Sequence, residues 1–466
     1  MNMQKTILLT RFLFSDKLSN SRFNILLPIL FYFLVSGCNK YLDAKQDKQL
    51  VVPTTVADLQ AMLDYYTRVN NKDPGAGEVS SDNYYLTTAT WTGLSKESDR
   101  NLYTWSDSNL FPAPPNDWSN SYDIVYVANT VLDNLPIVAY SGEFNDVKGQ
   151  ALFTRAKSFL NIAGIWSQAF DSLTADKDLG IALRLTSDFN APSVRSSVKQ
   201  TYAQIITDLK SAITLLPTTP VSAYRASKPA AYGLLARAYL FMRNYPQARL
   251  YADSCLQLKN QLMDYNTLSP GAAYPVPDLN VEVLMKTYIP TPSPLSNSRA
   301  KMDSLLYRSY DNNDLRKVIF FKSNGDGTYG FKGSYSSNAA LFDGIATDEL
   351  YLTRAECAAR VGDINNAMSD LNTVLRKRWK TGTFADLSAT NNNTALSLIL
   401  QERRKELLFR GLRWMDIKRL NKEGAAIILT RKLDNGNYTL QPNALHYALP
   451  LPEDVIGLSG MQQNPR

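Results

Sequence analysis

One pattern occurs twice in this chain, and it limits the fold more than any other feature of the sequence. Residues 227–258, SKPAAYGLLARAYLFMRNYPQARLYADSCLQL, align with residues 346–377, ATDELYLTRAECAARVGDINNAMSDLNTVLRK, at a constant displacement of 119 residues. Two antiparallel helices approach closely only where the side chains between them are small. The repeat therefore predicts two helix pairs, each with an aromatic residue followed by two small residues at matching positions: Tyr232, Ala236 and Ala248; Tyr351, Ala355 and Ala367.

The spacing within each copy is that of a tetratricopeptide repeat. Asn244 in the first copy and Gly362-Asp363 in the second mark the tight turn between the helices. Apolar residues at intervals of three and four predict further amphipathic helices, and Trp118 and Trp166 lie on their apolar stripes, as core residues would. These helices are expected at about 117–135, 152–170, 202–216 and 396–420, the last of them long and charged.

Two stretches between the helical regions have a different composition. Residues 70–116 and 260–345 are rich in Asn, Asp, Ser, Pro and Tyr, and long irregular segments in a compact helical domain are usually functional. A short β-ribbon is expected at Lys317–Lys332, turning at SNGDGTYG. We therefore expect a mainly α fold, a superhelix of tetratricopeptide-like helix pairs at about 117–260 and 346–420, with long irregular loops and a few short β-hairpins.

The N-terminal segment has the layout of a secretory signal. Four basic residues precede an apolar run at Phe23–Val35, which is too short to span a bilayer as a helix. Ser36 and Gly37 are small enough to let a peptidase approach the bond before Cys38, and a Cys at this position resembles a bacterial lipobox. We expect residues 1–37 to be a lipoprotein signal peptide, residues 38–466 to be a single domain, and Cys38 to carry the lipid. An ordinary signal peptide or membrane anchor with an incidental Cys is the alternative.

Composition narrows the class of protein further. The net charge of +7 falls to about +4 without the signal segment, which does not indicate nucleic-acid binding. The two remaining cysteines, Cys255 and Cys357, lie in helical patterns and are expected to be buried free thiols. The single histidine, His446, is expected in a strand, as a packed or surface residue, so a His-rich metal site is not expected.

Motifs for catalysis are weak throughout the sequence. The G-x-G-x-x-G at Gly325–Gly330 is read as a hairpin turn, because no helix start follows it. The strongest enzyme candidate is QERRKELLFRGLRWMDIKRL at residues 401–420, whose Glu402, Glu406, Arg413 and Asp416 fall on one helical stripe. Carboxylates beside arginines are held ionised, whereas a general acid needs the opposite. We therefore predict a structural ion-pair network and no enzyme, cofactor or metal.

From Cys38 to the C-terminus the chain contains a series of motifs in a specific order: CNKYLD, DWSNSYDIVYVANTVLDNLP, RAKSFLNIAGIWSQAF, YAQIITDLKSAITLLP, KPAAYGLLARAYLFMRNYPQA, NDLRKVIFF, DELYLTRAECAARVGDINNAMSDLN, QERRKELLFRGLRWMDIKRL and ALPLPEDVIGLSGMQQNPR. On these motifs the chain resembles a known family, the SusD/RagB surface glycan-binding lipoproteins of Bacteroidetes-type bacteria. Arg410 stands where that family usually carries Glu, which alters the ion-pair network.

The resemblance implies a function and partners. It implies a scaffold of helix pairs whose loops build a shallow binding face for oligosaccharides or, in some members, peptides. It also implies a SusC-like TonB-dependent transporter as partner, and an outer-membrane location facing outward, with the lipid on Cys38. No catalysis is implied.

Sugars need flat aromatic rings for their C–H faces and polar side chains for their hydroxyls. Tyr288 and Tyr307 are further aromatics of the second loop-rich stretch. The first stretch supplies the predicted ligand-binding residues: Asp82, Asn83, Tyr84, Tyr85, Trp91 and Trp105.

Two rival functions stay open. A tetratricopeptide-type scaffold would bind proteins through an exposed groove lined by polar and basic residues. A glycosidase would need a pair of carboxylates about 5–10 Å apart in a cleft.

Overall fold

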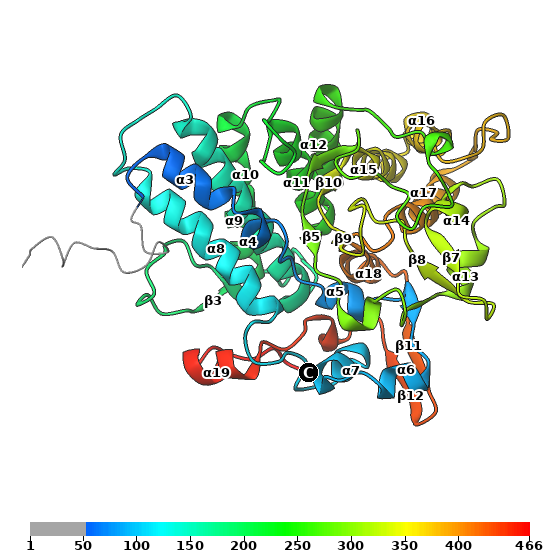
Figure 1. Ribbon diagram of the computed structural model, residues 1–466, viewed down its shortest axis with the longest axis horizontal. Coiled ribbons are helices and arrows are strands. Elements are labelled where there is room, and N and C mark those ends of the chain that lie inside the picture. Colours follow the sequence, from blue (N-terminus) through cyan, green and yellow to red (C-terminus); the bar gives the residue numbers. More distant parts are fainter. Residues whose placement is uncertain (1–52) are drawn as a thin grey trace, which may run out of the picture. The chain divides into compact units, whose positions relative to one another are not determined.

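The computed structural model describes residues 53–466, and Figure 1 shows that α-helices dominate this part of the chain. The helices, numbered as in Figure 1, are α3 Val56–Leu63, α4 Tyr66–Val69, α5 Ala76–Ser80, α6 Thr88–Thr92, α7 Glu97–Tyr103, α8 Asp117–Asn134, α9 Phe144–Trp166, α10 Val198–Leu215, α11 Lys228–Phe241, α12 Tyr245–Leu258, α13 Ser304–Arg308, α14 Arg316–Ile319, α15 Thr347–Arg360, α16 Ile364–Leu375, α17 Asn392–Glu406, α18 Arg413–Asn421 and α19 Glu453–Ser459. The predicted signal segment and Cys38 lie outside the described residues.

The long helices pack in succession along the chain. Helix α8 packs on α9, α9 on α10, α10 on α11, α11 on α12, α12 on α15, and α15 on both α16 and α17. Within α11–α12 and α15–α16 only three residues, 242–244 and 361–363, connect the two helices, as expected for helix pairs. None of the helices in residues 53–466 combines the length and apolar composition that crossing a bilayer requires.

The two predicted repeats are confirmed as the helix pairs α11–α12 and α15–α16. Asn244 and Asp363, equivalent positions in the two copies, are the N-caps of α12 and α16, and their side chains accept backbone N–H groups of Gln247 and Asn366. Such a cap satisfies a donor that the first turn of a helix leaves unpaired. The four small residues predicted at the helix contacts, Ala236, Ala248, Ala355 and Ala367, are completely buried.

The expectation of one long helix from Leu396 to Leu420 is wrong. Helix α17 ends at Glu406, α18 begins at Arg413, and Phe409 and Gly411 between them have positive φ angles of 56° and 72°. A right-handed helix cannot pass through such residues, because left-handed backbone interrupts its hydrogen-bond ladder. The helical stripe proposed for the four charged residues is therefore broken in the middle.

The loop-rich stretches contain short helices and two-stranded ribbons. The ribbon predicted near residue 325 is confirmed as β7–β8, whereas His446 lies in a 3-10 helix, Leu445–Tyr447, and not in a strand. All described strand pairs are antiparallel: β1 Tyr84–Tyr85 with β6 Lys301–Met302, β2 Leu179–Ala182 with β3 Arg195–Ser197, β4 Val283–Met285 with β10 Ile345–Ala346, β5 Tyr288–Ile289 with β9 Leu341–Phe342, β7 Phe321–Ser323 with β8 Tyr329–Phe331, and β11 Leu429–Leu433 with β12 Gly436–Leu440.

One continuous apolar core runs beneath the helices and loops, and Cys255 and Cys357 lie in it as free, buried thiols, as predicted. A smaller cluster lies between α3, α8 and the start of α9 and includes Leu59, Ile124 and Val131. Helix α8 therefore has two apolar faces. One faces this cluster, and the other carries Trp118, which is buried against Trp166 in the main core.

Candidate functional site: the loop face

Short strands bring the two loop-rich stretches together. Strand β1 pairs antiparallel with β6, which places Tyr84 opposite Met302 and Tyr85 opposite Lys301. Side chains of directly opposed residues project from the same face of a ribbon, and neighbours along a strand project from opposite faces. Tyr84 and Met302 therefore enter the core, while Tyr85 and Lys301 face outward and are half-buried.

A second pair of tyrosines lies beyond Lys301. The rings of Tyr307, in α13, and Tyr329, in β8, are stacked with centroids 3.6 Å apart and 16° between their planes. The Lys317 ammonium lies 5.4 Å from the Tyr307 ring centroid. Partial burial, followed by the contact with Tyr329, raises the pKa of Tyr307 to about 12.

Lys301 connects the two parts of this surface. Its ammonium donates to a carboxylate oxygen of Asp326 at 2.6 Å and to the Thr328 hydroxyl at 2.9 Å, both in the β7–β8 turn. We call Tyr85, Lys301, Tyr307, Asp326 and Tyr329 the loop face. It offers half-exposed phenol rings beside charged and hydroxyl groups. Such a surface can stack on a flat apolar ligand face and hydrogen-bond to the ligand's rim.

Three of the six predicted ligand residues lie inside the protein. Asn83, Tyr84 and Trp105 are at most 4% exposed, which leaves no ring face or amide for a ligand. Tyr84 donates its hydroxyl to the Val79 carbonyl, and the Trp105 indole donates to the Ser80 carbonyl. Burying the rings of Tyr84 and Trp105 removes their apolar surface from water, and this stabilises the fold.

A buried arginine organises this aromatic group. The Arg431 guanidinium lies 5.2, 4.3 and 5.0 Å from the ring centroids of Tyr84, Tyr103 and Trp105, and donates to four backbone carbonyls around them. Cation–π contact and hydrogen bonds to carbonyls replace the water that a buried charge loses. The rings are therefore occupied by Arg431.

The other three predicted residues are not fully buried. The Asp82 carboxylate receives two hydrogen bonds from Arg413, at 2.7 and 2.8 Å, and lies 3.2 Å from Arg404. Burial opposes ionisation of Asp82, but Arg413 and Arg404 more than offset it and hold its pKa well below the ordinary value. Tyr85 belongs to the loop face, and Trp91 is half-buried with its indole N–H donated to the Arg100 carbonyl. Ligand contact by Tyr85 and Trp91 stays a prediction.

The structure gives each residue of the predicted ion-pair network a charged partner, in three separate groups. Glu402 and Glu406 both contact Arg316, and Glu406 also accepts from Arg378 at 2.7 Å. Arg413 pairs with Asp82, as described above. Asp416 accepts from Arg403 and Arg419; burial raises its pKa, but these two arginines lower it further, to about 2.

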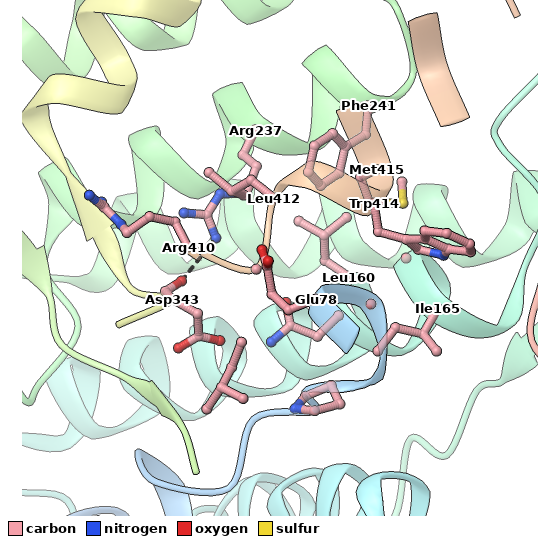
Figure 2. Close-up of a pocket in the computed structure, with 16 residues that line it drawn as sticks. Glu78, Leu160, Ile165, Arg237, Phe241, Asp343, Arg410, Leu412, Trp414 and Met415 are labelled. Carbon is pink, nitrogen blue, oxygen red and sulfur yellow. Dashed lines mark hydrogen bonds between the residues drawn. The ribbon is translucent and has the colours of Figure 1, made fainter. Parts of the chain in front are cut away.

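Two carboxyl groups with raised pKa values line one small cavity, which Figure 2 shows between α9, α5 and the α17–α18 connection. Burial is the main cause for both: it raises the pKa of Glu78 to about 7 and that of Asp343, which also faces Asp73, to about 8. The cavity volume is about 30 Å³, enough for about two water molecules. A sugar ring is far larger, so this carboxyl pair does not meet the requirement of a glycosidase cleft.

The helix pairs also form a groove. Residues of α12, α15 and α16 line a cleft of about 600 Å³, and its charged residues are Arg249, Asp253, Arg354 and Asp370. Arg354 pairs with both Asp253 and Asp370. A scaffold that binds proteins through its repeat groove would have polar lining of this kind, although these charged residues already have ion-pair partners.

Lys301, Asp326 and Tyr329 of the loop face were not among the residues predicted from the sequence, although all three lie in the second loop-rich stretch. The turn of the β7–β8 ribbon was visible in the sequence as SNGDGTYG, and it supplies Asp326 and Tyr329 to the loop face. The pairing of β1 with β6, which brings Tyr85 beside Lys301, could not be predicted, because the two strands are more than 200 residues apart in the chain.

Comparison with known proteins identifies the family. A family described as "Starch-binding associating with outer membrane" matches residues 40–240, and one described as "SusD family" matches residues 347–465. No curated protein sequence matches the chain.

Solved structures share the fold at low sequence identity. A SusD superfamily protein from Bacteroides thetaiotaomicron is 22% identical, with a TM-score of 0.71 over 89% of this chain and 100% of the other. A SusD-like carbohydrate binding protein from Bacteroides vulgatus is 20% identical (TM-score 0.65; 88% and 97% covered). Surface glycan-binding protein A from Bacteroides uniformis is 16% identical (TM-score 0.67; 88% and 99% covered). Because these two family matches together cover residues 40–240 and 347–465, the chain belongs to the SusD/RagB family.

Proposed function

We propose that this protein is a lipid-anchored outer-membrane protein that binds oligosaccharides at the loop face and delivers them to a SusC-like TonB-dependent transporter. The observation that carries the proposal is that three half-exposed tyrosines, from segments distant in sequence, meet around Lys301 on one surface. Family membership supports the ligand class, because the matching family is described as starch-binding and outer-membrane associated.

The chemistry of the loop face suits a sugar ring. A pyranose has an apolar C–H face and a rim of hydroxyls, so it is bound by a ring to stack on and polar groups at the edge. Tyr85, Tyr307 and Tyr329 supply rings. Lys301, Asp326 and the tyrosine hydroxyls supply donors and acceptors. A peptide with aromatic or polar side chains is the alternative ligand for the same surface.

Delivery is proposed from the family resemblance, and anchoring from the sequence. Cys38 behind Ser36 and Gly37 is the proposed acylation site, and several acyl chains hold a protein on a bilayer at about 0.8 kcal/mol per buried CH₂. We expect Cys38→Ser to move the protein from the membrane fraction to the soluble fraction. Continued partitioning of Cys38→Ser into the detergent phase would contradict the anchor.

No enzymatic activity is proposed. Glu402 and Glu406 are held by Arg316 and Arg378, and the Glu78–Asp343 pair lines a cavity too small for a sugar. The groove of α12, α15 and α16 favours a second candidate, a surface for a protein partner.

The loop face is tested by calorimetric titration with maltotriose, cellotriose, xylotriose and mannotriose. We expect the double variant Tyr85→Ala/Tyr329→Ala to weaken trisaccharide binding about tenfold or more at an unchanged melting temperature, because two stacking surfaces are lost. Tyr65→Ala is the matched control, since Tyr65 is 60% exposed and outside the loop face. If the double variant binds with unchanged affinity, the loop face is not the binding site. If none of the four sugars binds the parent protein measurably, glycan binding itself is contradicted.

A further inference from the structure

A second cleft lies against α8. Its volume is about 530 Å³, and it lies between α8, the segment 182–193 that follows β2, and α19 with Met461. Ligand-binding pockets commonly have volumes of about 300–1,000 Å³. None of the loop-face residues lines this cleft.

The floor of the cleft comes from one stripe of α8. Trp118, Tyr122, Val125, Tyr126 and Asn129 follow each other at helical intervals and all line the cleft. The rings of Trp118 and Tyr122 lie in contact, with centroids 4.7 Å apart. The Tyr122 hydroxyl donates to the Ala182 carbonyl, so this ring is fixed in place at the base of the loop wall.

The loop wall is held firmly at its base. The Asn129 amide donates to the carbonyls of Arg184 and Thr186, and Asp133 accepts from the backbone N–H and hydroxyl of Ser187. Arg184 bends the tip back by donating to Ser193 at 3.2 Å and to the carbonyls of Asp188 and Ala191. The wall is therefore preformed.

At its tip the loop presents an aromatic ring. Phe189 stacks on Tyr126 with centroids 4.7 Å apart and 30° between the planes, yet it is 78% exposed. Leu458, on the opposite rim, is 89% exposed. Two large apolar side chains in water on either side of an aromatic floor indicate a surface that a ligand covers.

The polar groups of the cleft define the chemistry of that ligand. Arg184 is the charged residue of the lining, and its guanidinium is occupied by the loop contacts above. Within residues 53–466, the hydroxyls of Tyr126 and Thr186 and the amide oxygen of Asn190 make no hydrogen bond. The cleft thus combines aromatic rings with neutral hydrogen-bonding groups and no free charge. A charged ligand would lose its hydration there without gaining an ion pair.

We infer that this α8 cleft is a second ligand site that takes a neutral oligosaccharide, with a sugar ring against Phe189 and Tyr126 and its hydroxyls toward Thr186 and Asn190. The ligand class rests on the proposed function, whereas the location rests on the cleft itself. The cleft and the loop face then bind a chain at two separate places, which strengthens binding of long glycans more than of short ones.

The test uses the same four neutral trisaccharides and calorimetric titration. We expect Phe189→Ala and Tyr126→Ala each to weaken the binding that remains in the Tyr85→Ala/Tyr329→Ala background about tenfold. Tyr140→Ala is the matched control, because Tyr140 also contacts a phenylalanine, Phe144, with centroids 5.1 Å apart, but lies outside the cleft. Phe189 is so exposed that its removal leaves folding intact, and the melting temperature checks this.

The outcomes separate the two proposals. If Phe189→Ala removes the binding that remains in the loop-face double variant, the cleft inference is supported. If only the cleft variants reduce binding, the inference is also supported, and the cleft becomes the primary site. The cleft inference is overturned if the loop-face double variant abolishes binding completely while Phe189→Ala and Tyr126→Ala bind with the affinity of the parent. The proposed function would then stand. If none of the four sugars binds the parent protein, both proposals fail.

Discussion

The helix pairs α11–α12 and α15–α16 have the same geometry but different chemistry. Matching positions of their first helices hold Pro229, Ala230 and Arg237 in α11, and Asp348, Glu349 and Glu356 in α15. All six residues are buried. The first helix is therefore buried mainly through apolar contacts, whereas the second buries three carboxylates.

Each of those carboxylates binds an arginine from another element. Asp348 accepts from Arg410 at 3.1 Å, Glu349 from Arg237, and Glu356 from Arg419. Helix α15 thus holds α11 on one side and the α17–α18 region on the other. Arg410, the position where the sequence departs from its family, also lies against Tyr335 and Phe342, 4.7 and 4.5 Å from their ring centroids. The same backbone geometry therefore accommodates apolar contacts in one pair and ion pairs in the other.

The largest expected effect is the loss of a buried carboxylate from α15. Glu356→Ala leaves Arg419 and Arg360 short of a partner, so we expect unfolding to become easier by about 3–5 kcal/mol. Thermal and urea denaturation measure this, with exposed Glu143→Ala as control. A loss as small as that of the control would show that α15 is not an ionic anchor.

Glu356 also predicts a pH dependence. Burial opposes ionisation, but Arg419, then Arg360 and Arg403, more than offset it and lower the pKa of Glu356 below 4.5. Its contribution to stability is present above the ordinary pKa and is lost as the pH falls through the folded value. Relative to the parent, Glu356→Ala should therefore be most destabilised at neutral pH and less so in acid.

Glu78 is a buried carboxylate whose pKa shifts in the direction opposite to that of Glu356. Burial raises its pKa from 4.5 to about 7, so its contribution is complete below pH 4.5 and is lost as the pH rises to about 7. We expect Glu78→Gln to flatten this part of the stability profile by about 3 kcal/mol. Parallel profiles for the two proteins between pH 4.5 and 7.5 would disprove a raised pKa.

The small residues at the helix contacts test the shared geometry. Ala236→Leu and Ala355→Leu insert a larger side chain at equivalent, completely buried positions, and we expect each to cost about 1–3 kcal/mol. Urea denaturation compares them. A large cost in one pair and none in the other would break the equivalence of the two repeats.

The smallest effect concerns the turns. Arg243 and Gly362 occupy equivalent positions with φ angles of 59° and 83°. Residues with a Cβ are strained in this left-handed region by about 1–2 kcal/mol, whereas glycine is not. We expect Arg243→Gly to stabilise the protein by about 1 kcal/mol and Gly362→Ala to destabilise it similarly, as urea midpoints would show. A loss of stability in Arg243→Gly would mean that the contacts of the arginine side chain outweigh its backbone strain.

Local patterns in the sequence predicted the helix pairs well. The positions of Ala236 and Ala355 follow from spacing, because a helix brings residues three and four apart onto one face. Asn244 and Gly362-Asp363 marked the turns, and the structure adds that Asn244 and Asp363 cap the second helices. The break at Phe409–Gly411 was missed, since charged residues continue at helical spacing on both sides of it. The stripe of Trp118 and Tyr122 was read as core, although it also forms the floor of a cleft.

The candidate site was predictable only as a region. Tyr84 and Tyr85 are adjacent and chemically identical, yet one lies in the core and the other on the loop face. Their difference depends on pairing with Met302 and Lys301, which no local pattern encodes. Likewise, the aromatic composition of residues 80–105 gave no sign that Arg431 would occupy three of the rings.

The amino-acid sequence alone was enough to predict the two helix pairs, the turns within them, the free thiols and the family. These depend on interactions between residues close in the chain, or on the order of motifs along it. The folded structure is needed to tell which tyrosines face solvent, which arginine pairs with each carboxylate, and where a cleft opens beside α8. The physical reason is that exposure and ion pairing depend on distant segments, such as Arg316 and Glu406, that meet only when the chain is folded.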